Sequence, residues 1–166
     1  QELGIVHRDL KPDNIMLTRR GKHEISKVLD FGIAKMQGAG PDEKQLTAAG
    51  MIFGTPAYMS PEQFGGVELD GRSDLYSLGV VFYLLATGQL PFRGATNVEI
   101  VKGHLETVPP APRDIKPDVP EELSALVMRL LEKKPRLRHS SAAALVGDFA
   151  AIAGRPFALE TPETRT

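Results

Sequence analysis

The chain has 166 residues, of which 42% are hydrophobic and 25% are charged, and its formal net charge is −1. This composition is typical of one globular domain with its own core, and the near-zero charge argues against nucleic acid or an anionic membrane as the default partner. The sequence contains no cysteine, which excludes disulfides and thiolate metal sites, and its longest apolar run (residues 80–86) is far shorter than the ~20 residues of a membrane helix.

No signal-peptide pattern opens the chain, and the lack of cysteine is compatible with a reducing compartment, so we expect a cytoplasmic location. The four histidines include no pair at metal-ligand spacing, which argues against a zinc site. Because the first residue is Gln1 rather than Met, we expect the chain to be a fragment of a longer protein. A membrane anchor downstream of Thr166 in that protein stays open.

Short apolar stretches recur through residues 1–32 and predict short strands joined by loops. A turn is predicted at residues 19–22, which read Arg-Arg-Gly-Lys. Two polar segments stand next to these strands: residues 7–14 read His-Arg-Asp-Leu-Lys-Pro-Asp-Asn, and residues 30–32 read Asp-Phe-Gly. The apolar strand positions are Val6, Ile15, Leu17, Ile25, Val28 and Leu29.

The side chains of these two polar segments offer the groups that phosphoryl transfer requires. Asp9 can accept a proton, Lys11 can neutralise a phosphate, and Asn14 with Asp30 offers the hard oxygen ligands that magnesium prefers. Protein groups contribute to such a transfer mainly by positioning the reactants and neutralising charge. Either segment alone is more often structural than catalytic, because Arg-Asp-Leu-Lys is an ordinary charged turn and Asp-Phe-Gly is an ordinary exit from a strand.

A third segment, residues 54–62, reads Gly-Thr-Pro-Ala-Tyr-Met-Ser-Pro-Glu. With all three segments in this order, the chain resembles the protein kinase family, most closely its bacterial eukaryotic-like (Hanks-type) serine/threonine members. The resemblance implies the C-terminal lobe of the protein kinase fold, mainly helical with a few short strands at the catalytic cleft. It assigns residues 1–153 to this partial catalytic domain and residues 154–166 to a polar tail. The N-terminal lobe, with its glycine-rich loop, lysine and helix glutamate, is expected upstream of Gln1.

The resemblance also implies roles for individual residues. It implies that Asp9 orients or deprotonates the substrate hydroxyl, that Lys11 neutralises the transferred phosphoryl group, and that Asn14 and Asp30 hold Mg²⁺ with ATP. Lys11, together with Thr55 bridging toward it and Asp9, marks the serine/threonine branch, so the implied substrates are serine and threonine hydroxyls of proteins. A further set is implied to brace the catalytic residues or the lobe: His7, Phe31, Gly32, Glu62, Asp74 and Arg138.

Residues 33–53 show little periodicity and correspond by resemblance to the activation loop. Thr47 is the only hydroxyl-bearing residue between Phe31 and Gly54. Because an arginine directly precedes the catalytic aspartate, we expect Thr47 to be phosphorylated and its phosphate to pair with Arg8. A mobile surface threonine is the alternative interpretation.

A helix is predicted from Ser73 or Asp74 to Thr87, where Gly88 ends it, and its apolar residues cover nearly every face, as in a buried helix. Asp74 at its start can simply favour the helix dipole. The resemblance adds a second role, in which Asp74 holds the backbone of the catalytic loop. We favour the second role.

The rest of the chain predicts three more helices and a connector. Residues 96–99 read as a capping box that starts a short helix, and residues 107–120, rich in proline, predict an extended connector. Apolar residues at helical spacing predict a helix over residues 123–131, and a last helix spans residues 141–152.

The basic residues between positions 133 and 138 suggest a nucleic-acid patch, but the resemblance implies instead that Arg138 pairs with Glu62. The sequence departs from the family at three places: Ser60 stands where alanine is usual, Lys134 where aspartate is common, and His139 where proline is common. The departure at Ser60 is mild, and those at Lys134 and His139 affect local packing rather than the catalytic groups.

Three functions are compatible with this pattern. In the first, the full-length parent transfers the γ-phosphate of ATP to protein serine and threonine hydroxyls, with the missing N-terminal lobe as a partner of this segment. In the second, the chain belongs to an inactive pseudokinase or is a truncated lobe that acts as a scaffold. A third, small-molecule phosphotransfer, is disfavoured by residues 54–62, which resemble a segment that seats protein substrates. We expect the first, with little or no turnover by the fragment alone.

Overall fold

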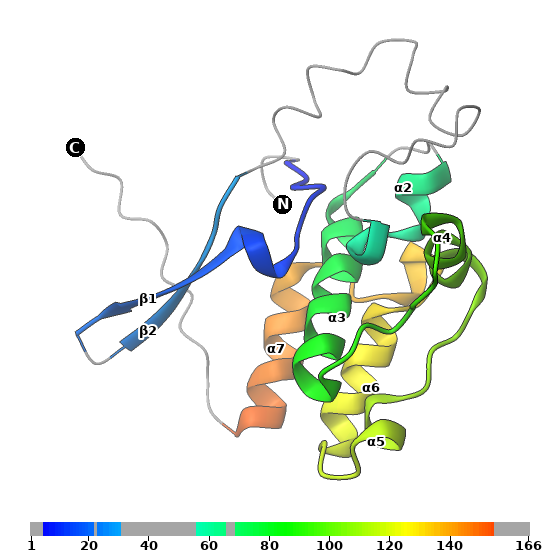
Figure 1. Ribbon diagram of the computed structural model, residues 1–166. Helices are drawn as coiled ribbons and strands as arrows, with labels where there is room; N and C mark the ends of the chain where they lie inside the picture. Colours follow the sequence, from blue (N-terminus) through cyan, green and yellow to red (C-terminus); the bar gives the residue numbers. More distant parts are fainter. Residues whose placement is uncertain (1–4, 22, 31–55, 66–68, 155–166) are drawn as a thin grey trace.

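The computed structural model describes residues 5–21, 23–30, 56–65 and 69–154. A two-stranded antiparallel hairpin, β1 (Ile15–Arg20) with β2 (His23–Val28), projects to one side of a group of helices (Figure 1). Ile15 pairs with Val28 and Arg20 with His23. The turn is therefore shorter than the predicted residues 19–22. Gly21 lies in it with a φ of 64°, a left-handed conformation that glycine adopts readily.

The regular structure in the rest of the described chain is helical, in agreement with the mainly helical fold predicted. The helices are α2 (Pro61–Gly65), α3 (Gly71–Thr87), α4 (Asn97–Glu106), α5 (Pro112–Ile115), α6 (Glu121–Leu130) and α7 (Ala142–Ala153). Three short 3-10 turns are η1 (Pro12–Asn14), η3 (Pro56–Tyr58) and η4 (Pro135–Leu137).

One prediction is wrong in the proline-rich connector, because residues 107–120 are not extended throughout. They contain the single-turn helix α5, which begins with Pro112 at a position where a proline is well tolerated. The carboxylate of Asp114 accepts the N–H of Ala111 at 3.1 Å and so satisfies one of the exposed donors at the helix start.

The central helix α3 begins at Gly71, earlier than the predicted Ser73, because Asp70 caps it. The Asp70 carboxylate accepts the N–H of Arg72 at 2.8 Å. Gly88 ends the helix as predicted, in the left-handed conformation with a φ of 78°. Asp74 therefore lies in the first turn of α3, where its side chain can contact residues far away in the sequence.

Packing between α3 and α6 forms most of the core. Gly79 of α3 permits the close approach, since a Cβ atom there would lie only 2.6 Å from the Cβ atom of Leu130. Leu145 extends the core to α7. The buried residues form two neighbouring clusters, one of Tyr76, Val80, Tyr83, Val127 and Leu131, the other of Leu75, Leu126, Leu130 and Leu145.

A buried histidine joins α4 to this core. His104 is fully buried; its Nε2 donates to the Ala57 carbonyl oxygen (3.1 Å), and its Nδ1 accepts from the Tyr76 hydroxyl (2.9 Å). The Phe92 ring lies edge-on with its centroid 4.7 Å away. Burial, with the nearby Lys133 charge, lowers the pKa of His104 from 6.5 to about 4.

The lowered pKa of His104 predicts that acid reduces the stability of the folded protein. Between pH 6.5 and 4 the unfolded chain binds a proton at this imidazole and the folded chain does not, so stability falls as the pH is lowered through that interval. The expected loss is about 3 kcal/mol. Denaturant titrations across this range should show a weaker pH dependence for His104→Gln than for the wild type.

The exposed His23 provides the matched control, since His23→Gln should leave the pH dependence unchanged. Some dependence remains in His104→Gln, because burial also lowers the pKa of His139. Identical pH profiles for His104→Gln and the wild type would contradict the assignment of this histidine.

Candidate catalytic site

The loop of residues 7–14 rests on the first turn of α3 through Asp74. One carboxylate oxygen of Asp74 accepts the N–H of His7 at 2.8 Å, and the other accepts the N–H of Arg8 at 2.9 Å. Burial raises the pKa of Asp74, although these two hydrogen bonds oppose the shift. The contact predicted between Asp74 and the loop backbone is therefore present.

His7 connects the same loop to the end of β2. Its ring is buried, Nε2 donates to the carbonyl oxygen of Leu29 at 2.9 Å, and Nδ1 accepts the N–H of Asp9 at 3.3 Å. The N–H of Leu29 in turn donates to the carbonyl oxygen of Asn14 at 2.8 Å. Because Leu29 directly precedes Asp30, these contacts place Asp30 beside the loop.

Three side chains singled out in the sequence converge within the loop. The Lys11 Nζ atom lies 3.5 Å from a carboxylate oxygen of Asp9, and both side chains are about a quarter exposed, at 22% and 27%. The Asn14 amide nitrogen donates to the Asp9 backbone oxygen at 2.7 Å and to its carboxylate at 3.3 Å. A carboxylate and an ammonium are thus held together and stay partly exposed, while the amide that contacts the carboxylate belongs to the buried Asn14.

The donor set fits a magnesium ion. Since the Asn14 amide nitrogen is engaged with Asp9, its carbonyl oxygen is the atom left to act as a ligand, and the exposed Asp30 offers a carboxylate nearby. Mg²⁺ is commonly held by one or two such oxygens, with phosphates and water completing its shell. No cluster of three or more His, Cys, Asp or Glu side chains suited to a metal ion occurs among the described residues, so such an ion needs those additional oxygens.

Backbone strain marks the same place. Within the described ranges, the non-glycine residues with positive φ are Arg8, at 66°, and Asp30, at 50°. This left-handed region is unfavourable for residues with a Cβ atom, and strain of this kind concentrates at functional sites. Neither residue type signals it, so sequence reasoning missed this feature of the site.

A buried ion pair joins α2 to Arg138, which directly follows η4. The Arg138 guanidinium contacts the Glu62 carboxylate through two bonds, Nη1–Oε1 at 2.6 Å and Nη2–Oε2 at 2.9 Å. Burial opposes ionisation of Glu62, but hydrogen bonds from Arg138 and Ser73 outweigh it and lower the pKa of Glu62. The remaining three N–H groups of Arg138 donate to the backbone oxygens of Arg72, Glu132 and Lys133. The predicted Glu62–Arg138 pair is therefore formed.

The basic segment around Arg138 does not present a uniform charged patch. Lys133 donates to the Gly103 carbonyl oxygen at 3.2 Å, near the C-terminal end of α4, and its Nζ atom lies 4.2 Å from the Phe92 ring centroid. Burial, with the Arg138 charge, lowers the pKa of Lys133 to about 8. Arg138 is buried and Lys133 is bonded to α4, so these two charges are not presented together on the surface. This arrangement argues against a nucleic-acid surface here.

Four residues named from the sequence lie outside the described ranges. They are Phe31, Gly32, Thr47 and Thr55. The predicted pairing of phosphorylated Thr47 with Arg8 and the predicted bridge from Thr55 to Asp9 and Lys11 therefore stay predictions.

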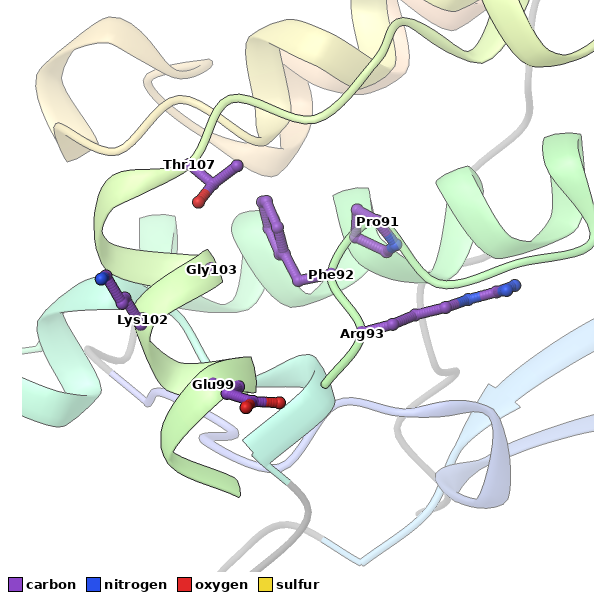
Figure 2. A pocket seen from close by; sticks show the side chains of 7 residues that line it. All are labelled: Pro91, Phe92, Arg93, Glu99, Lys102, Gly103 and Thr107. Atoms are coloured by element: carbon purple, nitrogen blue, oxygen red, sulfur yellow. The ribbon is translucent and has the colours of Figure 1, made fainter. Parts of the chain in front are cut away.

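A surface hollow of about 270 Å³ lies between residues 91–93 and α4 (Figure 2). Gly103 allows the close packing at its base, because a Cβ atom there would lie 2.8 Å from the Cβ atom of Phe92. The hollow is lined by Pro91, Phe92, Arg93, Glu99, Lys102, Gly103 and Thr107. None of these residues belongs to the loop 7–14 or to the hairpin, so the hollow is separate from the candidate catalytic site.

Comparison with known proteins decides the family. Residues 1–150 match the model of the protein kinase domain. The chain belongs to the protein kinase family.

The similar proteins are bacterial serine/threonine kinases. The chain is 46% identical over 152 residues to serine/threonine-protein kinase pkn3 of Myxococcus xanthus, covering 90% of this chain and 28% of that protein. It is 50% identical over 142 residues to Pkn1 of the same organism, covering 85% of this chain and 20% of that protein. A probable serine/threonine-protein kinase of Clostridium acetobutylicum is 38% identical over 149 residues, with 90% and 22% covered.

The chain therefore spans between about a fifth and a third of the length of these relatives. Among the described residues, none of the helices has the length and apolar character needed to cross a membrane.

Proposed function

We propose that residues 1–153 are the C-terminal lobe of a serine/threonine protein kinase domain, with residues 154–166 as a tail beyond it. In the complete protein, this lobe transfers the γ-phosphate of ATP to serine and threonine hydroxyls of protein substrates. The observation that carries the proposal is the convergence of Asp9, Lys11 and Asn14 in a loop anchored by Asp74. Because ATP is the phosphate donor, we place the domain in the cytoplasm.

The chemistry follows from the side chains at this loop. Asp9 accepts a hydrogen bond from the substrate hydroxyl, orients it and takes its proton as the hydroxyl oxygen bonds to the γ-phosphorus and the bond from that phosphorus to the leaving ADP oxygen breaks. Lys11, 3.5 Å from that carboxylate, neutralises charge on the transferred phosphoryl group. Asn14 and Asp30 would hold Mg²⁺, which would supply positive charge to neutralise the phosphate oxygens of ATP.

Exposed apolar side chains support a second lobe over the hairpin. Leu17 and Val28, which share one face of the hairpin, are 74% and 44% exposed, while Met16 on the other face and Ile5 before the loop are each more than 40% exposed. A group of exposed apolar side chains of this kind marks a surface that another part of a protein covers. In this family the N-terminal lobe carries the glycine-rich loop and the ATP-binding lysine. We propose that it covers these apolar side chains, and we expect the lobe described here to need it for activity.

The proposal is tested by the identity of the phosphorylated product. The complete kinase domain, incubated with labelled ATP, Mg²⁺ and a general protein substrate, should yield phosphoserine and phosphothreonine, and EDTA should abolish both. Label found only on tyrosine or on small molecules would contradict the proposed substrate class. A folded domain that transfers nothing would favour a scaffold function instead.

We also propose that phosphorylation of Thr47 controls the site through Arg8. The added dianion would form charge-assisted hydrogen bonds with the Arg8 guanidinium, adjacent to Asp9. Mass spectrometry of the active kinase should find phosphate on Thr47, and the Thr47→Ala variant should be less active. Full activity with an unmodified Thr47 would rule out this mode of control.

A further inference from the structure

Gln63, the residue after Glu62 in α2, bridges two segments at the catalytic loop. Its Nε2 atom donates to the carbonyl oxygen of Arg8 at 2.9 Å. Its Oε1 atom accepts the N–H of Ser60 at 2.9 Å and the Ser60 hydroxyl at 3.2 Å. Because both Ser60 donors occupy the amide oxygen, the amide nitrogen is the end that faces Arg8.

The bonded carbonyl belongs to a strained residue. Arg8 has a φ of 66°, and its N–H is already held by Asp74. The Gln63 bond fixes its other side, so the left-handed residue is held from α3 at its N–H and from α2 at its carbonyl oxygen. Strained conformations persist where the surrounding structure fixes them in this manner.

The same peptide group leads directly into Asp9. The carbonyl of Arg8 and the N–H of Asp9 form one planar unit, and that N–H donates to His7 at 3.3 Å. Rotation of this unit would move the Asp9 backbone and break the contact with His7. Holding the Arg8 carbonyl therefore limits the orientations that the Asp9 carboxylate can adopt toward a substrate hydroxyl.

We propose that Gln63 is a positioning residue for Asp9, acting through the peptide between Arg8 and Asp9. Ser60 stands where the family usually has alanine. Its two hydrogen bonds to the Gln63 amide oxygen fix the orientation of that amide. Placement of residues 60–63, at the end of the segment that resembles a substrate-docking element, then sets the orientation of the catalytic carboxylate. This inference rests on the proposed kinase function.

The test uses Gln63→Glu and Gln63→Ala in the complete kinase domain. Glutamate keeps the size of the side chain and an acceptor for Ser60, but its ionised form places a carboxylate oxygen against the Arg8 carbonyl oxygen. We expect kcat to fall about 10²-fold in both variants at pH 7.5, because a small misplacement of a catalytic group has an effect of this size. The KM values for ATP and peptide should stay near those of the wild type.

The pH profile separates positioning from a general loss of structure. A protonated glutamate can donate to the Arg8 carbonyl as glutamine does, so the deficit of Gln63→Glu should shrink as the pH is lowered toward 5.5. Gln63→Ala has no such donor and should show no recovery. The matched control, Gln89→Glu, makes the same chemical change just beyond the C-terminal end of α3 and should leave kcat unchanged.

Amide hydrogen exchange gives a readout that does not depend on activity. Exchange at Asp9 and Leu10 should be faster in both Gln63 variants than in the wild type, and unchanged in Gln89→Glu. Unchanged exchange at these amides, or wild-type kcat in both Gln63 variants, would overturn the inference. A wild-type domain that transfers no phosphate would instead refute the proposed function, and the exchange rates would still decide whether Gln63 holds this peptide. If Gln63→Ala does not fold, the exchange and pH profile of Gln63→Glu decide.

Discussion

Replacing Asp9 with asparagine is expected to slow phosphate transfer by the complete kinase domain by about 10²–10⁴-fold, the range typical for loss of a general base. Asparagine keeps the size of the side chain but cannot accept the proton of the substrate hydroxyl. The loop should keep its place, because Asp74 and Asn14 hold it through backbone atoms of His7, Arg8 and Asp9. Steady-state transfer to a serine/threonine peptide, together with thermal melting, measures both expectations.

Asp118→Asn is the matched control for this substitution. Asp118 is exposed in the turn between α5 and α6, so the same chemical change there should leave both transfer and melting unchanged. An Asp9→Asn variant that keeps the wild-type rate while folding normally would show that Asp9 does not act on the substrate hydroxyl.

Arg138→Ala is expected to lower the free energy of unfolding by about 3–5 kcal/mol, because it leaves the buried Glu62 carboxylate without its partner. For a chain of this length, that loss corresponds to a melting temperature lower by about 6–20 °C. Arg138 lowers the pKa of Glu62, so its stabilising effect is present above the usual glutamate pKa and fades as the pH falls below it. Thermal melting at neutral pH measures this loss of stability. Melting at acidic pH tests whether the difference between Arg138→Ala and the wild type becomes smaller, as expected.

Two further variants define the origin of this loss. Replacing both partners, as in Glu62→Leu with Arg138→Met, should destabilise less than Arg138→Ala, since no buried charge is then left alone. Arg129→Ala removes a half-exposed arginine that contacts Asp148 at 3.3 Å and should change stability by less than about 1 kcal/mol. Unchanged stability in Arg138→Ala would contradict the importance of the Glu62 pair.

Local signals in the sequence predicted much of the fold. The apolar periodicity of residues 123–131 corresponds to α6, and Gly88 ends α3 as its position indicated. Two details differ because they depend on side chains that compete for backbone groups: Asp70 starts α3 earlier, and Asp114 supports α5 inside a proline-rich segment. The apolar pattern of the strands did not reveal that Leu17 is exposed, since periodicity shows a face and not what covers it.

The parts of the candidate site that belong to a sequence motif could be predicted. The parts that depend on contacts between distant residues could not. The residues of the loop 7–14 could be named from their chemistry and order, and the family resemblance pointed to Asp74 and Arg138. No local pattern predicts the bond from Gln63 to Arg8, which joins residues 55 positions apart. The same is true of His104, whose hydrogen bonds reach α3 and η3 and whose sequence neighbours give no sign of them.

We propose that this chain carries the chemistry of phosphate transfer but only one side of the ATP site. The most direct measurement compares Mg²⁺-dependent transfer from labelled ATP to a serine/threonine substrate by this chain alone and by the complete kinase domain. We predict transfer by the complete domain and little or none by the chain alone. Transfer by the chain alone would contradict the need for a second lobe, and no transfer by a folded complete domain would contradict the catalytic role of the loop 7–14.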